Sequence, residues 1–295
     1  MGRDVTSNTN IHSIRKSLLN SLYGIQLHQG NLSLNDTVGM LGIEDHSPLS
    51  STEKEATVAQ LMSSSSGIYH PASEESRRMM AKRPKRGSKS PGTHFYYNNW
   101  DFNVLGTIYN HKTKGDLFQD FQKYIAEPIG MEDFQLDETT YHYDKNKSVH
   151  PAYLFRMSTR DLARFGLLYL NNGKWKDKQI VPQSWIAKST SVKFDVPSKS
   201  VYGYGYLWWV ADEGSFKDLK LISAVGRYGQ SIDIIPVRDL VFVHKVDSNK
   251  KGFFHKSVKG VSQKQRLKLL SLILEAQETS PVSEPKLIPF SPVRY

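Results

Sequence analysis

Apolar residues near the start of the chain recur at intervals of three and four, the spacing of one helix face. They are Ile11, Ile14, Leu18, Leu22 and Ile25. Gly30 follows them and suits a helix C-terminus. The pattern predicts an amphipathic helix over residues 11–27.

The same reasoning predicts further helices along the chain. One covers 57–62, and one starts near Trp100 and carries Phe102, Leu105 and Ile108. Others cover 118–129, 182–187 and 263–276, and one begins at the capping pair Ser158 and Asp161 and ends at Asn171-Asn172-Gly173. Residues 71–94 contain three prolines and two glycines, which indicates a loop.

Aromatic and β-branched residues become frequent after residue 200. Residues 202–210, 231–236 and 240–246 are predicted strands, joined by short connections that favour antiparallel pairing. Helices first, strands next and a closing helix indicate an α+β fold. We expect one domain over 1–277, mostly helical over 1–199 and then strands with a final helix over 200–277. A proline-rich extended tail follows over 278–295.

The composition excludes several classes of site. The chain has no cysteine, so it has no disulfide, no cysteine-ligated zinc site and no thiol nucleophile. The ten histidines lack H-x-x-x-H spacing, so we expect neither a metal nor a cofactor. No apolar run is long enough to span a membrane, and residues 1–5 lack the apolar run of a signal peptide. The compartment and the oligomeric state stay unknown.

Ser13 and Lys16 form the first candidate site, a Ser-x-x-Lys pattern. Their spacing puts both side chains on one helix face, where a lysine of lowered pKa could take the serine's proton. Alone, the pattern is also typical of a polar residue at a helix start beside a solvated lysine.

Two further segments could contribute polar groups to one pocket. Tyr97 and Asn99 offer a phenol and an amide, although an aromatic anchor with a helix-capping Asn has the same pattern. Residues 224–230, Ala-Val-Gly-Arg-Tyr-Gly-Gln, contain glycines that let a backbone approach a ligand closely; an ordinary strand-entry turn is the alternative.

In this order, the three segments resemble those of the serine β-lactamase and penicillin-binding-protein superfamily. The chain is most similar to class C β-lactamase-like esterases and amidases, including the 6-aminohexanoate-dimer hydrolase group. The likeness extends over about residues 5–277. It is carried by residues 12–18, 57–62, 66–71, 96–101 with Leu105-Gly106, 157–170 and 202–209.

The resemblance implies acyl transfer to Ser13, with Lys16 and Tyr97 handling the proton. Which of these two is the base stays open. Asn99 would hold Lys16 or the substrate amide. The backbone N–H groups of Ser13 and Arg227 would form an oxyanion hole, with Gly226, Gly229 and Gln230 at the substrate-binding strand. The substrate would be a small ester or amide.

Two departures from the family pattern matter. The third motif, commonly Lys-Thr-Gly, is here Ala224-Val225-Gly226, so the cation that grips a substrate carboxylate is missing unless Arg227 replaces it. This shifts the expected activity from β-lactamase towards esterase or amidase. In addition, only twelve residues precede Ser13, so we expect the sheet to lack its first strands and to have an open edge. An exported, longer form of the chain would be periplasmic or secreted, as the bacterial family suggests.

Much of the net charge of +10 lies in one stretch, the basic segment, residues 77–89. Its cations are Arg77, Arg78, Lys82, Arg83, Lys85, Arg86 and Lys89. Without interleaved aromatics or a nucleic-acid motif, we expect no nucleic-acid partner. A solvated loop and a rim that attracts acidic substrates are both consistent with it.

Three other features have a simple structural interpretation. His70 and His94 flank the expected pocket and are typical of structural histidines, while Trp208-Trp209 could line a cleft or fill the core. The main prediction is a serine hydrolase. The alternatives are a catalytically silent or truncated relative that binds acyl or peptidoglycan-like ligands, and an anion-binding module that uses the basic segment.

Overall fold

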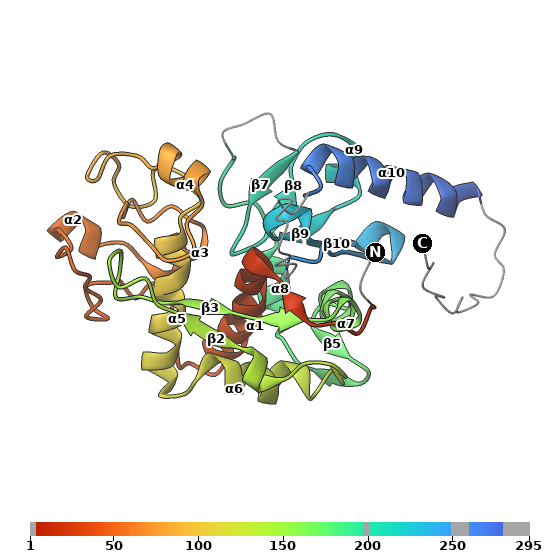
Figure 1. The fold of residues 1–295 in the computed structure, drawn as a ribbon, viewed down its shortest axis with the longest axis horizontal. Helices are drawn as coiled ribbons and strands as arrows, with labels where there is room; N and C mark the ends of the chain where they lie inside the picture. Colours follow the sequence, from red (N-terminus) through yellow and green to blue (C-terminus); the bar gives the residue numbers. More distant parts are fainter. Residues whose placement is uncertain (1–3, 197–200, 249–259, 280–295) are drawn as a thin grey trace, which may run out of the picture. The chain divides into compact units, whose positions relative to one another are not determined.

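A computed structural model describes residues 4–196, 201–248 and 260–279 of the chain (Figure 1). The chain divides into two compact units, residues 1–260 and 261–295, which are described separately. The second unit contains α10 (Gln263–Thr279), in agreement with the helix predicted over 263–276. Residues 280–295 of the predicted tail lie outside the described residues, and the domain limits at 277 and 278 stay a prediction.

The first unit contains nine α-helices in its described residues. They are α1 (Arg15–His28), α2 (Ser51–Lys54), α3 (Val58–Met62), α4 (Arg77–Lys82), α5 (Asn99–Thr113), α6 (Leu117–Phe121), α7 (Thr159–Leu170), α8 (Gln183–Ser189) and α9 (Gly214–Asp218). Short 3-10 turns are η1 (His12–Ile14), η3 (Leu136–Glu138), η4 (Arg227–Gly229) and η5 (Pro236–Arg238), and η2 (Gln122–Ala126) continues α6 as a π-helix.

The main sheet has five antiparallel strands in the order β11-β10-β9-β8-β7. They are β7 (Tyr202–Tyr204), β8 (Trp209–Ala211), β9 (Ile222–Val225), β10 (Ser231–Ile235) and β11 (Leu240–His244). Three small pairs complete the described strands: β1 (Thr9–Asn10) with β4 (Arg156–Met157), β2 (Thr140–His142) with β3 (Ala152–Leu154), and β5 (Lys174–Trp175) with β6 (Lys178–Gln179). This mixture confirms the predicted α+β class.

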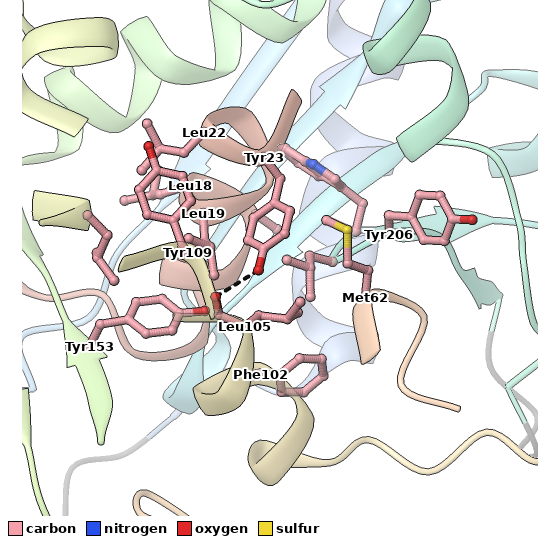
Figure 2. Close-up of a cluster of buried hydrophobic side chains, with 14 of the residues drawn as sticks. Leu18, Leu19, Leu22, Tyr23, Met62, Phe102, Leu105, Tyr109, Tyr153 and Tyr206 are labelled. Atoms are coloured by element: carbon pink, nitrogen blue, oxygen red, sulfur yellow. Dashed lines mark hydrogen bonds between the residues drawn. The ribbon is translucent and has the colours of Figure 1, made fainter. Parts of the chain in front are cut away.

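Helix α1 lies near the centre of the first unit, and α7 packs directly against β10 and β11 (Figure 1). Figure 2 shows Leu18, Leu22 and Tyr23 of α1 packed beside Leu105 and Tyr109 of α5. The Tyr23 hydroxyl donates a 2.8 Å hydrogen bond to the Leu105 carbonyl, which gives the buried phenol a partner. The two helices therefore share one core.

The prediction that α1 is amphipathic is wrong in one respect. Every residue from Arg15 to Gln26 is buried, including the polar ones. Ser17 and Asn20 donate hydrogen bonds to the carbonyls of Leu207 and Tyr206, so the polar side of α1 faces other backbone rather than water. A helix surrounded by protein needs such partners for its polar side chains.

The strand predicted over 202–210 is two strands, because a turn interrupts it. Gly205 N–H donates to the Trp208 carbonyl across this turn, and Leu207 has a positive φ of 61°. β9 was not predicted as a strand, since Ser223 and Ala224 are small residues without strong β preference. The segment before Ser13 pairs through β1 with β4, and β11 and β7 are the end strands of the five-stranded sheet as far as the described residues extend.

The loop predicted over 71–94 contains a short helix, α4. Ser76 caps it, since its hydroxyl accepts a hydrogen bond from the backbone N–H of Met79. The helix ends at Lys82, because Pro84 disfavours a helical conformation at Arg83, which is extended. The helices predicted at 57–62, near Trp100, at 118–129, after Ser158 and at 182–187 correspond to α3, α5, α6 with η2, α7 and α8.

Candidate active site

Ser13 and Lys16 meet at the start of α1, as the Ser-x-x-Lys spacing predicted. Ser13 lies in η1, and Lys16 lies in the first turn of α1. The Lys16 Nζ atom is 3.1 Å from the Ser13 Oγ atom. Ser13 is partly exposed, whereas Lys16 is 1% exposed. The serine is therefore open to a ligand, and the amine beside it is shielded from water.

Tyr97 and Asn99 complete a cluster around the same amine. Lys16 Nζ is 2.8 Å from the Tyr97 hydroxyl and 2.9 Å from Asn99 Oδ1. The helix cap is the neighbouring Asn98, whose Oδ1 accepts from the N–H of Trp100. Asn99 is thus free to contact Lys16, and its Nδ2 donates a 2.8 Å hydrogen bond to the Glu74 carbonyl.

The surroundings of Lys16 disfavour its protonated form. Burial lowers its pKa well below the usual value, the positive charge of Arg15 lowers it further, and Glu74 acts in the opposite direction. Burial also raises the pKa of Tyr97 to about 12, although a hydrogen bond with Ser13 and the charge of Arg15 oppose this. These directions favour a neutral amine beside a neutral phenol.

Aromatic rings cover the cluster. Lys16 Nζ is 4.2 Å from the ring centroids of both Tyr97 and Phe102. Trp209 stacks on Tyr97, with centroids 5.4 Å apart and an interplanar angle of 23°. Trp208 is fully buried and contacts Phe165 and Tyr169. The tryptophan pair is therefore divided: Trp208, at the end of the turn before β8, lies in the core, and Trp209, the first residue of β8, lies against Tyr97.

Gly226 brings the third segment close to the serine. A Cβ atom at Gly226 would lie 2.5 Å from the carbonyl oxygen of Ile11, two residues before Ser13. Only glycine allows this approach without displacing backbone. Within the described residues, the N–H groups of Ser13 and Arg227 donate no hydrogen bond. Two unsatisfied donors thus lie on segments that pack against each other.

Gln230 and Gly229, also predicted in this segment, make hydrogen bonds that involve backbone carbonyls. Gln230 is fully buried, and its Nε2 donates to the carbonyls of Asn10 and Arg227. The Gly229 carbonyl lies 3.0 Å from His244 Nδ1. The exposed Arg227 side chain lies over the Tyr228 ring, 5.4 Å from its centroid. Gln230 therefore anchors the strand end to β1.

Sequence reasoning missed three residues near the cluster. Arg15 and Glu74 act on Lys16 through their charges. His12 has a positive φ of 50° and a ring centroid 5.6 Å from that of Tyr228. Burial lowers the pKa of His12 to about 4, the charges of Arg227 and Arg15 add to this, and Glu74 opposes it. His12 and Arg15 lie inside the motif segment 12–18, and Glu74 follows the segment 66–71 by three residues. This closeness in sequence was the only available signal.

The basic segment is partly fixed by internal ion pairs. Arg86 binds both carboxylate oxygens of Glu53 at 2.9 and 2.7 Å, and Arg83 pairs with Glu75 at 2.5 Å. The remaining cations of the segment are exposed. The Tyr96 hydroxyl donates to the carbonyl of Met79 in α4, which links this segment to the residue next to Tyr97.

His70 is buried at 3% exposure, packs against Trp100 and lies 3.5 Å from Glu53. This is the structural role expected for it. His94 is half-buried. Across the described ranges, no three side chains of the metal-binding types gather, and no helix is both long and apolar enough to cross a bilayer. A hollow of about 450 Å³ lined by Thr107, Tyr141 and their neighbours contains none of the predicted site residues.

Comparison with known proteins identifies the family of the chain. The model of the family described as Beta-lactamase matches residues 4–258. No curated protein sequence matches the chain.

Several solved structures have the same fold. A penicillin-binding protein homologue from Pyrococcus abyssi, described as octameric, is 24% identical with a TM-score of 0.59; the match covers 78% of this chain and 59% of that one, so this chain spans about three fifths of its length. A protein from Bacillus anthracis, suggested to be a 6-aminohexanoate-dimer hydrolase, is 20% identical with a TM-score of 0.69 over 94% and 74%. A class C beta-lactamase is 17% identical with a TM-score of 0.68 over 94% and 84%.

Proposed function

Because this chain belongs to the beta-lactamase family, which implies serine hydrolase activity in general, we propose that it hydrolyses an ester or amide through an acyl-enzyme on Ser13. One observation carries the proposal. A buried lysine amine lies within hydrogen-bonding distance of a partly exposed serine hydroxyl, a phenol and an amide oxygen.

Lys16 is the proton acceptor in this proposal. A neutral amine has two N–H donors and one lone pair, which matches its three contacts. The donors bind Tyr97 and Asn99, and the lone pair accepts the proton of Ser13. The Ser13 oxygen then attacks the substrate carbonyl, and Lys16 returns the proton to the leaving alcohol or amine, with the Tyr97 hydroxyl as the adjacent relay. Water releases the acyl group by the reverse route.

The free N–H groups of Ser13 and Arg227 supply the oxyanion hole. Two backbone donors aimed at one carbonyl oxygen stabilise the charge that develops there, without reorganisation during the reaction. The requirement for glycine at 226 supports this arrangement, since any side chain there would push the two segments apart. Removing one oxyanion donor typically costs about 10²–10³ in kcat.

The third motif favours a substrate without a carboxylate, because it lacks the lysine that would bind one. Ala224 is fully buried and has no charge, whereas the family motif commonly has lysine there. The Arg227 side chain is exposed and lies over the Tyr228 ring. We therefore favour an uncharged ester or amide over a β-lactam or peptidoglycan stem.

Hydrolysis of p-nitrophenyl acetate, p-nitrophenyl butyrate and the matching anilides tests this function. The wild type should release nitrophenol from the esters or nitroaniline from the anilides with saturation kinetics, and Ser13→Ala should reduce the rate to that of buffer. A folded wild type without activity on any of these, but with saturable binding of acyl-D-alanine peptides, would support the silent relative that only binds ligands. Activity that survives Ser13→Ala would refute Ser13 as the nucleophile.

A further inference from the structure

Arg15 is a buried cation that the proposed acyl transfer does not use. It lies between Ile14 and Lys16 at the start of α1 and is 2% exposed. Among the described residues no carboxylate forms an ion pair with it; its partners are the Asn103 side-chain oxygen at 3.1 Å and the Tyr153 ring at 4.4 Å. Its Nη1 atom has no hydrogen-bond partner.

These partners hold the guanidinium without neutralising its charge. An amide oxygen and an aromatic face both attract a cation, yet neither is an anion. Asn103 is itself fixed, because its Nδ2 donates a 3.2 Å hydrogen bond to the Ser73 carbonyl. Burying a charge without a counter-ion is unfavourable for folding, and an apolar side chain would avoid this cost. An uncompensated charge at this position therefore calls for a role in the site.

We propose that Arg15 is a positioning residue whose fixed charge keeps Lys16 in its neutral form, ready to take the proton of Ser13. The inference rests on the proposed function. When the Ser13 O–H bond breaks and the proton forms a bond to Lys16 Nζ, two buried like charges on consecutive residues of α1 repel each other. The same repulsion then favours return of that proton to the leaving group, so Arg15 assists both steps.

The groups that contact Lys16 are uncharged side chains, so they do not cancel the charge of Arg15. Ser13 faces it from η1, and Tyr97 and Asn99 face it from the start of α5. Among the described residues, the acid whose charge acts on Lys16 is Glu74, whose Oε1 is 2.7 Å from His142 Nδ1. After burial, Arg15 has the largest influence on the pKa of Lys16, ahead of the opposing Glu74. Arg15 also lowers the pKa of Tyr97, which otherwise rises through burial.

The rate of Ser13 labelling by a fluorophosphonate, measured from pH 5 to 10, tests the proposal without a known substrate. The acid limb of this profile reports deprotonation of the base. The wild-type limb should lie well below the ordinary lysine value of about 10.4. In Arg15→Met the amine keeps its proton to higher pH, so the limb should move up by about one unit. At a pH below both limbs this is a loss of about tenfold.

Three variants separate charge from structure. Arg15→Lys keeps the charge and should restore the wild-type limb. Asn103→Asp leaves Arg15 in place but supplies a carboxylate that offsets its field, so the limb should also move up. Arg78→Met makes the same substitution at an exposed cation and should leave the limb unchanged.

An unchanged limb in Arg15→Met or Asn103→Asp would overturn the proposal, as would a wild-type limb near the ordinary lysine value. The position of the wild-type limb is informative even where Arg15→Met fails to fold, because it needs no variant. Absence of labelling in the folded wild type would instead refute the proposed function, so the two failures are distinguishable.

Discussion

The start of α1 and the basic segment both hold adjacent cations, but their surroundings differ. Arg15 and Lys16 are 2% and 1% exposed and have no carboxylate contact within the described residues. Arg83 and Arg86 pair with Glu75 and Glu53, and the remaining cations of the basic segment are exposed. Burial makes each charge in the first region act strongly on its neighbour, whereas water and counter-ions weaken the second. The charge at the proposed site is therefore controlled by these two buried residues rather than by the larger number of cations on the surface.

Removing the buried amine should give the largest effect. Lys16→Met keeps the length of the side chain but removes the group that accepts the Ser13 proton, so kcat/KM for p-nitrophenyl butyrate should fall about 10²–10⁴-fold. Circular dichroism checks that the variant folds. The control is Lys82→Met at an exposed cation, which should keep wild-type activity. Equal rates for Lys16→Met and wild type would contradict the proton-transfer role.

Removing the Arg86–Glu53 ion pair of the basic segment should lower the free energy of unfolding and leave the activity unchanged. Arg86→Gln removes the bidentate partner of Glu53, a residue that is 4% exposed. We expect the free energy of unfolding to fall by about 1–2 kcal/mol, because Arg86 itself is partly solvated. Urea denaturation measures this loss. Lys85→Gln, at the preceding exposed cation, should change stability by less than about 0.5 kcal/mol. Similar losses in both variants would mean that the Glu53 pair is not the anchor.

Burial also acts on a carboxyl group, whose pKa it shifts in the opposite direction to that of Lys16. Asp101 is fully buried, burial raises its pKa well above the usual value, and its Oδ2 atom has no hydrogen-bond partner. Its neutral form is favoured in the folded state, so the stability it contributes is present at low pH and is lost as the pH rises through the folded pKa.

Asp101→Asn keeps the oxygen that accepts from Ser66 and Asn98 and removes the titration. The variant should be more stable than wild type by about 1 kcal/mol at pH 8, and the gain should shrink towards pH 4. Thermal unfolding at the two pH values measures the difference. A gain that is constant with pH would show that the carboxyl does not titrate in the folded state as its burial implies.

The smallest effect is expected for the free cations of the basic segment. The triple variant Arg77→Gln, Arg78→Gln and Lys82→Gln should keep the stability of the wild type within about 0.5 kcal/mol. Its kcat/KM for a neutral ester should be unchanged, while that for an anionic ester should fall a few-fold at low salt, because steering acts through long-range charge. Equal changes for both esters would exclude a steering role for α4.

Much of the site could be predicted from the sequence, because its parts are local motifs. The Ser13 and Lys16 spacing implies one helix face, and Tyr97 and Asn99 lie at the entry to α5, the next long helix of the core. The roles of Arg15 and Glu74 could not be predicted in this way. Their effect depends on which segments pack around α1. The spacing of apolar residues predicted that the polar face of α1 is exposed to solvent, whereas this face is buried.

In the fold as well, locally encoded elements could be predicted and elements that depend on distant contacts could not. Helices with clear caps, such as α3 after Thr57 and α7 after Ser158, were predicted almost to the residue, because a side-chain cap is encoded locally. The sheet was harder. β9 has small residues and depends on its neighbours for its hydrogen bonds, and the turn between β7 and β8 is held by a contact from Leu207 N–H to the distant carbonyl of Met62.

Intact-mass analysis after exposure to a fluorophosphonate tests the nucleophile most directly, on wild type and on Ser13→Ala. We predict a single phosphonyl adduct on the wild type, formed as the Ser13 oxygen displaces fluoride, and no adduct on Ser13→Ala. A folded wild type that stays unmodified, or an equal adduct on both proteins, would contradict Ser13 as an activated nucleophile.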